Sequence, residues 1–321
     1  MEHLALITER NVKFTSSDVE LIGTLAQPEG GGPFPAVLLL PSSGPIDRNG
    51  NHAALHMNAF QLFAEALAEQ GIASLRYDKR GVGASRGRYL DAGFHDNVAD
   101  AQRALLFLRK DTSVQGRPVF LLGHSEGALI STLLAAKGVQ IAGVILLAGG
   151  ARSGEDMLRW QVQQVAKGMR GLNKWVMKVF RTDVVKAQQK RLNRLKQSSE
   201  NSYGVQLVAK VNARWMREYI VYNPAVDLPK IRVPILAITG GKDIQVDPAD
   251  LEQMSSLVKT DFESHVVPDV THMLRPDAED PPSLSSYNEQ VKEPLDPRVV
   301  NLVSEWLAKR LSSQPSLPES K

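Results

Sequence analysis

Short aliphatic runs recur along the chain and alternate with longer stretches in which apolar residues are spaced three or four apart. The runs are typical of strands buried on both faces and occupy residues 36–40, 72–75, 119–122, 141–147 and 235–238. The stretches between them, residues 53–70, 95–108 and 127–137, have the periodicity of amphipathic helices. This alternation predicts an α/β protein with a mostly parallel central sheet and helices on both of its faces.

The flanking segments complete this sheet. Residues 11–14 and 19–26 alternate like an antiparallel hairpin at one edge, and residues 263–267 read as a last strand. We expect helices over 249–257 and 297–311, followed by a mobile Ser- and Pro-rich tail over 312–321.

A helical insertion interrupts the alternation between the strands at 141–147 and 235–238. Residues 151–224 have helical periodicity, for example at Leu158, Val162 and Val165. We therefore expect a core made of residues 1–150 and 225–311 and a helical cap made of residues 151–224.

Composition limits the possible chemistry. The chain has 321 residues, of which 43% are hydrophobic and 23% charged, as in an ordinary globular protein. It has no cysteine, which excludes thiolate catalysis, disulfides and metal sites built from cysteine. The first residues do not resemble a signal peptide, and no apolar run is long enough to span a membrane, so a cytoplasmic location is expected.

Charge is concentrated in the insertion. The full chain carries a net charge of only +3, but the insertion holds fifteen Lys or Arg against five Asp or Glu. Three interpretations are open: a solvated surface, a field that attracts anionic substrates or a lipid surface, and nucleic-acid binding. Nucleic acid is not expected as a partner, because no recognition motif accompanies the charge.

The sequence Gly-His-Ser-Glu-Gly at 123–127 directly follows a predicted strand and precedes a predicted helix. In this setting a G-x-S-x-G motif exposes its serine above the sheet, and side chains larger than the flanking glycines would collide with neighbouring elements. We therefore predict that Ser125 is a nucleophile.

A serine hydroxyl needs a base, and the base needs an acid that orients it. Of the seven histidines, His272 is the predicted base, because it lies in the loop after the last predicted strand. His265 falls inside that strand, and His124 lies within the turn of the nucleophile. The other four, His3, His52, His56 and His95, are expected at the surface or near helix starts.

Asp243 is the predicted acid, because it follows the turn glycines at the end of the strand over 235–238. Asp247 is the first alternative, although it could instead cap the helix at 249–257, and Asp269 and Asp277 remain further alternatives. The resulting chain order of Ser, Asp and His is the order found in α/β hydrolases.

Attack on a carbonyl also requires N–H donors for the oxyanion. The backbone amide of Glu126 follows the nucleophile and opens a helix, so it is one predicted donor. Ser43, in the loop after the strand over 36–40, is the other, although that loop could also be a simple Pro- and Gly-containing turn. Within the same loop, Asp47 and Arg48 are expected to pair.

These motifs, together with the segment Arg-Tyr-Asp-Lys-Arg-Gly-Val-Gly-Ala-Ser at 76–85, resemble those of the α/β hydrolase superfamily. The similarity is to bacterial carboxylesterases and to lysophospholipase-like or serine-aminopeptidase-like members with a helical cap, and it extends over residues 19–311. It implies Ser125, His272 and Asp243 as the triad and the amides of Ser43 and Glu126 as the oxyanion donors. The chain departs from these relatives at Pro41-Ser42, where a His-Gly pair is usual, and at Asp247, where proline is common.

The sequence thus predicts a serine esterase that acts on a small-molecule ester through an acyl-enzyme intermediate. No metal site is expected, because no His, Asp and Glu cluster has ligand spacing, and no cofactor is implied. An amidase, peptidase or thioesterase with the same triad, or a non-catalytic binding protein with this fold, remains an alternative. The substrate and the oligomeric state do not follow from these residues.

Overall fold

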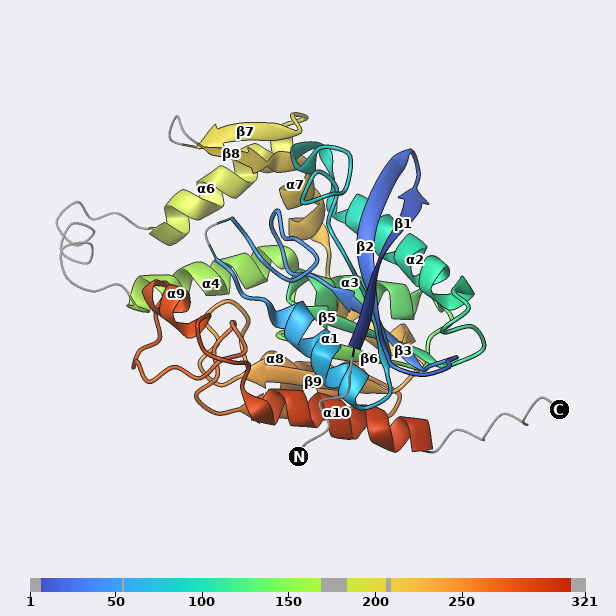
Figure 1. Ribbon diagram of the computed structural model, residues 1–321. Coiled ribbons are helices and arrows are strands. Elements are labelled where there is room, and N and C mark those ends of the chain that lie inside the picture. The colour runs from blue at the N-terminus through green and yellow to red at the C-terminus, as the bar shows by residue number, and fades with distance from the viewer. Residues whose placement is uncertain (1–6, 54, 169–183, 206–208, 313–321) are drawn as a thin grey trace.

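A twisted sheet of eight strands forms the centre of the computed structural model, which describes residues 7–53, 55–168, 184–205 and 209–312 (Figure 1). The strand order is β1-β2-β4-β3-β5-β6-β9-β10. The β1/β2 and β2/β4 pairs are antiparallel, and every other neighbouring pair is parallel. The strands are β1 (Ile7–Ser16), β2 (Val19–Pro28), β3 (Ala36–Leu40), β4 (Ala73–Tyr77), β5 (Val119–His124), β6 (Gly143–Leu147), β9 (Ile235–Gly240) and β10 (Phe262–Val267).

Helices cover both faces of this sheet. On one face, α2 (Phe94–Lys110) and α3 (Glu126–Ala136) pack against the strands, and on the other face lie α1 (Ala59–Glu69) and α10 (Pro297–Ser312). Two short helices, α8 (Asp250–Leu257) and α9 (Tyr287–Gln290), occupy the connections near β10. The predicted architecture, mostly parallel with helices on both faces, is therefore confirmed.

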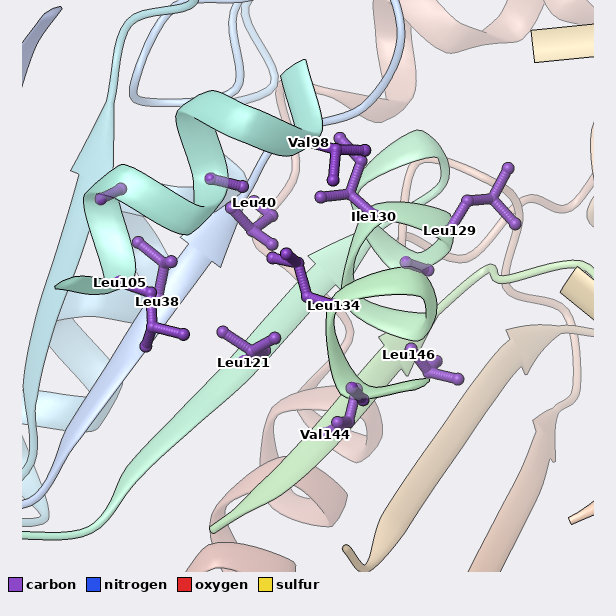
Figure 2. Packing of buried hydrophobic residues seen from close by; sticks show 14 of the residues in the cluster. Leu38, Leu40, Val98, Leu105, Leu121, Leu129, Ile130, Leu134, Val144 and Leu146 are labelled. Carbon is purple, nitrogen blue, oxygen red and sulfur yellow. The ribbon is translucent and has the colours of Figure 1, made fainter. Parts of the chain in front are cut away.

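The central strands divide their side chains between two buried clusters. Leu38 and Leu40 of β3 point into the cluster that contains α2 and α3, as Figure 2 shows, whereas Val37 and Leu39 belong to the cluster on the opposite face. All five residues of β3 are buried. Successive side chains of a strand point to opposite faces, so a strand buried on both faces is apolar throughout. The continuous aliphatic run at residues 36–40 therefore identified β3 in the sequence.

The predicted boundaries needed correction at α1, at β6 and at β1, where the strand expected over 11–14 extends over Ile7–Ser16. The helix expected from residue 53 begins at Ala59, because the preceding residues form a loop in which Asn51 and Asn58 hydrogen bond to each other through both side chain and backbone. Asn58 has a φ of 50°, in the left-handed region, so it is not α-helical and the helix begins after it. The strand expected from residue 141 begins at Gly143.

The insertion between β6 and β9 contains α4 (Gly154–Gly168), α6 (Val184–Gln197) and α7 (Ala213–Val221). Besides these helices, the insertion contains an antiparallel hairpin that the sequence pattern did not predict, formed by β7 (Ser202–Val205) and β8 (Ala209–Asn212). Figure 1 shows α6, α7 and this hairpin together at the top left, beside the carboxyl ends of the parallel strands. Trp215 and Tyr222 connect the insertion to the core cluster under α2.

The expected mobile tail begins at residue 312, but Ser312 still belongs to α10 and the following residues lie outside the described part. Within the described residues, none of the helices has the length and apolarity needed to cross a membrane.

Candidate active site

Ser125 lies at the sharp turn between β5 and α3. Its φ of 55° and ψ of −113° are unusual for a residue other than glycine, and such strain is typical of functional turns. The backbone amide of Ser125 donates to the carbonyl of Leu147 in β6 at 2.9 Å, which ties the turn to the neighbouring strand. The side chain of Ser125 is partly exposed, as the strand-turn-helix context predicted.

The two glycines beside this turn are needed for space. A Cβ atom on Gly123 would lie 2.1 Å from the carbonyl oxygen of Gly127, and one on Gly127 would lie 2.0 Å from the carbonyl oxygen of Leu40. Neither glycine has a positive φ, so close approach of backbone and not conformational freedom requires them. The predicted collision is therefore confirmed.

His272 and Asp243 form a buried pair at the carboxyl ends of β10 and β9. The Nδ1 atom of His272 lies 2.8 Å from Oδ2 of Asp243, and both side chains are almost fully buried. The other carboxylate oxygen of Asp243 accepts the backbone amides of Gln245 at 2.7 Å and Val246 at 2.9 Å. Since an ionised carboxylate can only accept, this arrangement places a proton on Nδ1 of His272 and leaves Nε2 as a hydrogen-bond acceptor.

Ser125 and His272 lie at the same edge of the sheet, since both follow the carboxyl ends of parallel strands. Among the contacts of the described residues, no hydrogen bond joins their side chains. Catalytic hydrogen bonds are often long in a protein without substrate and shorten when substrate binds.

His124 is a residue of this site whose position the sequence did not reveal. Its ring lies 4.8 Å from that of His272, and its Nε2 atom lies 3.0 Å from the backbone carbonyl of His272. A carbonyl can only accept, so Nε2 of His124 carries the proton. Burial, with the nearby His272 ring as a smaller cause, holds the pKa of His124 well below its ordinary value. His124 is therefore neutral and supports the backbone of the His272 loop.

The alternative carboxylates have partners away from His272. Asp247 binds Arg152 at 2.5 Å and accepts the amide of Ala249 at 3.1 Å, but it does not cap α8, whose N-cap residue is Ala249 and which has no side-chain cap hydrogen bond. Asp277 accepts hydrogen bonds from Ser286 and Gln290, and Asp269 is exposed, 3.8 Å from Lys242.

The remaining histidines are dispersed. His265 pairs with Glu263 at 2.9 Å within β10, and the ring of His95 packs beside Phe94. His3 lies outside the described residues. In the described ranges, no three His, Asp or Glu side chains gather closely enough to hold a metal ion.

The loop after β3 brings Ser43 to a cavity that His272 also lines. Asp47 shapes the loop by accepting the amides of Asn49 and Asn51, at 2.8 and 2.9 Å. The expected pairing of Asp47 with Arg48 is wrong, because Arg48 instead donates to both carboxylate oxygens of Asp78. This ion pair joins the loop to the turn that follows β4.

The backbone amides of Ser43 and Glu126 are the predicted donors to the oxyanion. Within the described part of the chain, neither amide donates a hydrogen bond. Glu126 is the first residue of α3, where amides lack acceptors within the helix and the helix dipole favours an anion.

Two cavities meet at this loop. One, of about 230 Å³, is lined by His272 together with Ile46, Leu55 and Met57. The other, of about 420 Å³, extends under the insertion, where Tyr89 and Trp215 line it. Ser43 and His52 line both, so His52, expected only as a surface or helix-start residue, borders the site.

Comparisons with known proteins identify related sequences and structures. Residues 53–279 match the family described as serine aminopeptidase, S33. Esterase EstD of Thermotoga maritima is 27% identical over 295 residues, which cover 90% of this chain but only 66% of the length of EstD.

Two solved structures share the fold. Est1E of Butyrivibrio proteoclasticus, solved with bound ferulic acid, has a TM-score of 0.63 at 16% identity. The match covers 94% of this chain and 100% of the Est1E chain. Proline iminopeptidase of Mycobacterium smegmatis also has a TM-score of 0.63, at 14% identity, and covers 95% of this chain and 99% of its own.

Proposed function

The chain belongs to the serine aminopeptidase S33 family and has the α/β hydrolase fold, and from this premise we propose that it is a serine hydrolase that cleaves carboxylic esters through an acyl-enzyme intermediate. The observation that carries the proposal is the buried hydrogen bond between His272 and Asp243 at the same sheet edge as the strained Ser125. A cleft in which a histidine is oriented by a carboxylate near a serine is the arrangement used for acyl transfer.

Each residue has a separate task in this mechanism. Ser125 attacks the ester carbonyl, and His272 takes the serine proton on Nε2 and later returns it to the leaving alcohol. Asp243 holds the imidazole tautomer that makes this possible and stabilises the imidazolium that forms. The amides of Ser43 and Glu126 bind the oxyanion, and water then attacks the acyl-enzyme with His272 as the base.

The cavities suggest how an ester would bind. The smaller cavity beside His272 is lined by the apolar side chains of Ile46, Leu55 and Met57 and suits one apolar group of the ester. The larger cavity, lined by Tyr89 and Trp215, suits a second and bulkier group. Ser43, whose amide is one of the donors proposed for the oxyanion, lines both cavities.

Ester hydrolysis is preferred over amide hydrolysis because the curated relative EstD is an esterase and Est1E binds ferulic acid, a carboxylic acid. The description of the family as serine aminopeptidases and the similarity to proline iminopeptidase favour a peptidase as the second candidate. Thioester hydrolysis would use the same groups. A non-catalytic binding protein is the remaining alternative.

The insertion over residues 151–224 is proposed to act as a cap over the sheet edge that carries Ser125, with residues 1–150 and 225–311 as the core. We also propose that its basic surface contacts anionic substrates or a lipid surface.

A panel of p-nitrophenyl esters, matched p-nitroanilides and thioesters tests the substrate class. We expect turnover of neutral esters above that of the anilides and thioesters, and a loss of about 10³-fold or more in the Ser125→Ala variant, as for other triad nucleophiles. Faster cleavage of the anilides would make the protein an amidase or peptidase. Absence of any Ser125-dependent turnover would favour the binding protein.

A further inference from the structure

A buried ion pair lies beside the candidate active site. Lys79, in the turn after β4, places its Nζ atom 2.9 Å from Oε2 of Glu126, the residue that follows Ser125. The side chain of Lys79 is 4% exposed and that of Glu126 is fully buried. The other oxygen of Glu126 accepts hydrogen bonds at 2.8 Å from Asn97 Nδ2 and from the indole Nε1 of Trp215. The carboxylate therefore has three donors, from the core and from the insertion.

The same lysine also binds the loop after β3. Its Nζ atom donates to the carbonyl oxygen of Ser42 at 2.6 Å. The Ser42 carbonyl and the Ser43 amide are the two polar ends of one planar peptide group. A hydrogen bond that fixes the orientation of the Ser42 carbonyl therefore also fixes the orientation of the Ser43 N–H. In a trans peptide this N–H points in the opposite direction, away from Lys79. A cationic donor on the carbonyl also polarises this peptide and strengthens the amide as a donor.

We propose that Lys79 and Glu126 are positioning residues for the oxyanion hole. The ion pair connects the peptide that contains the Ser43 amide to the residue that contains the Glu126 amide, so it fixes the spacing and direction of both donors. This inference rests on the proposed function, since it assigns a task to residues around the same reaction. Through Trp215, the pair also connects the oxyanion hole to the insertion.

The neighbouring pair of Arg80 and Asp100 provides a matched control. Arg80 lies next to Lys79 in the chain, and its Nε and Nη2 atoms donate to Asp100 at 2.7 Å. Its Nη2 atom also donates hydrogen bonds to the backbone carbonyl and the hydroxyl of Ser16 in β1. Removal of this pair perturbs a partly buried ion pair on the same turn without touching the Ser42–Ser43 peptide.

The test compares two double variants, Lys79→Met/Glu126→Gln and Arg80→Met/Asp100→Asn. Each removes both charges together, so that neither leaves an uncompensated buried charge. The side-chain amide oxygen introduced by Glu126→Gln can still accept hydrogen bonds from Asn97 and Trp215, which keeps the insertion in contact. For both variants, kcat and KM are measured with a neutral p-nitrophenyl ester, together with the inhibition constant of a trifluoromethyl ketone that forms an oxyanion on the serine.

We expect Lys79→Met/Glu126→Gln to lower kcat by about 10- to 100-fold with little change in KM, below the 10²- to 10³-fold found when an oxyanion donor itself is removed. Affinity for the trifluoromethyl ketone should fall by a similar factor, because the inhibitor depends on the same donors. The Arg80→Met/Asp100→Asn control should keep both constants even where its thermal stability falls.

Suppose that turnover by the wild-type protein depends on Ser125. Full kcat and full ketone affinity in Lys79→Met/Glu126→Gln would then overturn the positioning role of the ion pair and leave the proposed function standing. Equal losses in both double variants would also overturn it, since the effect would then come from general destabilisation. A wild-type protein without Ser125-dependent turnover would contradict the proposed function and this inference together.

Discussion

Asp243 determines which nitrogen of His272 carries a proton. Oδ1 of Asp243 is held by the amides of Gln245 and Val246, so Oδ2 is the atom that faces His272 Nδ1. In an Asp243→Asn variant, the amide oxygen would keep the two backbone donors and the NH₂ group would face Nδ1. His272 would then adopt the tautomer with the proton on Nε2, which cannot accept the proton of Ser125.

Asp243→Asn is therefore expected to lower kcat for ester hydrolysis by about 10³- to 10⁴-fold, the scale known for loss of the correct histidine tautomer. Steady-state kinetics with a p-nitrophenyl ester measures this, and circular dichroism checks that the variant is folded.

Asp247→Asn is the matched control. Asp247 binds Arg152 and the amide of Ala249, away from His272, so kcat should stay within about threefold, as expected for a polar change outside the reacting groups. The reverse order of the two variants would assign the acid to Asp247.

Single residues of the candidate site could be predicted from the sequence where a local pattern identifies them. Ser125 has its motif, and Asp243 and His272 follow strands whose burial is visible in the pattern. Lys79 and His124 could not be predicted, because their tasks depend on contacts with Ser42 and His272, which are distant in the chain. No local pattern encodes such contacts.

At the scale of elements, burial determined which predictions succeeded. The central strands are buried on both faces and therefore apolar throughout, and α2, α3 and α10 were predicted to within two residues at each end. The β7–β8 hairpin was missed because its strands are only four residues long and form a sheet of two strands. A segment this short has too few alternating positions to be distinguished from helix or loop.

Helix α6 carries much of the positive charge of the insertion. Leu192 and Leu195 are buried, whereas Lys190, Arg191 and Arg194 are exposed. An exposed basic face attracts anions over a distance that salt limits, with a Debye length of about 8 Å at physiological ionic strength.

If this face draws in anionic substrates, replacing Lys190, Arg191 and Arg194 by glutamine should lower kcat/KM for an anionic ester by about threefold or more at low salt. This is below the roughly 10- to 10³-fold range of full electrostatic steering, because only three charges are removed. Added salt should reduce the difference, and a neutral ester should be unaffected. The measurement is kcat/KM for both esters across a salt series.

A control variant with Lys13, Lys110 and Lys259 replaced by glutamine removes the same charge from exposed positions outside α6. Equal effects of the two triple variants, or identical salt curves for both esters, would make α6 an ordinary solvated surface.

Across the whole molecule, the parallel sheet brings together groups that are far apart in sequence. Ser125, Asp243 and His272 each follow the carboxyl end of a parallel strand, at β5, β9 and β10, and the loop with Ser43 follows β3. Carboxyl ends of parallel strands share one edge, so the fold class alone predicts that these groups lie near each other. The fold class does not predict where the insertion packs, because its helices pack through contacts specific to this chain.

Covalent capture of the nucleophile tests the central claim most directly. The wild-type protein is incubated with a fluorophosphonate, and the labelled protein is measured by intact mass spectrometry and then by peptide mapping. We expect one label per chain, located on Ser125, and none in the Ser125→Ala variant. Label on another residue, or undiminished labelling of Ser125→Ala, would contradict the assignment of Ser125 as the nucleophile.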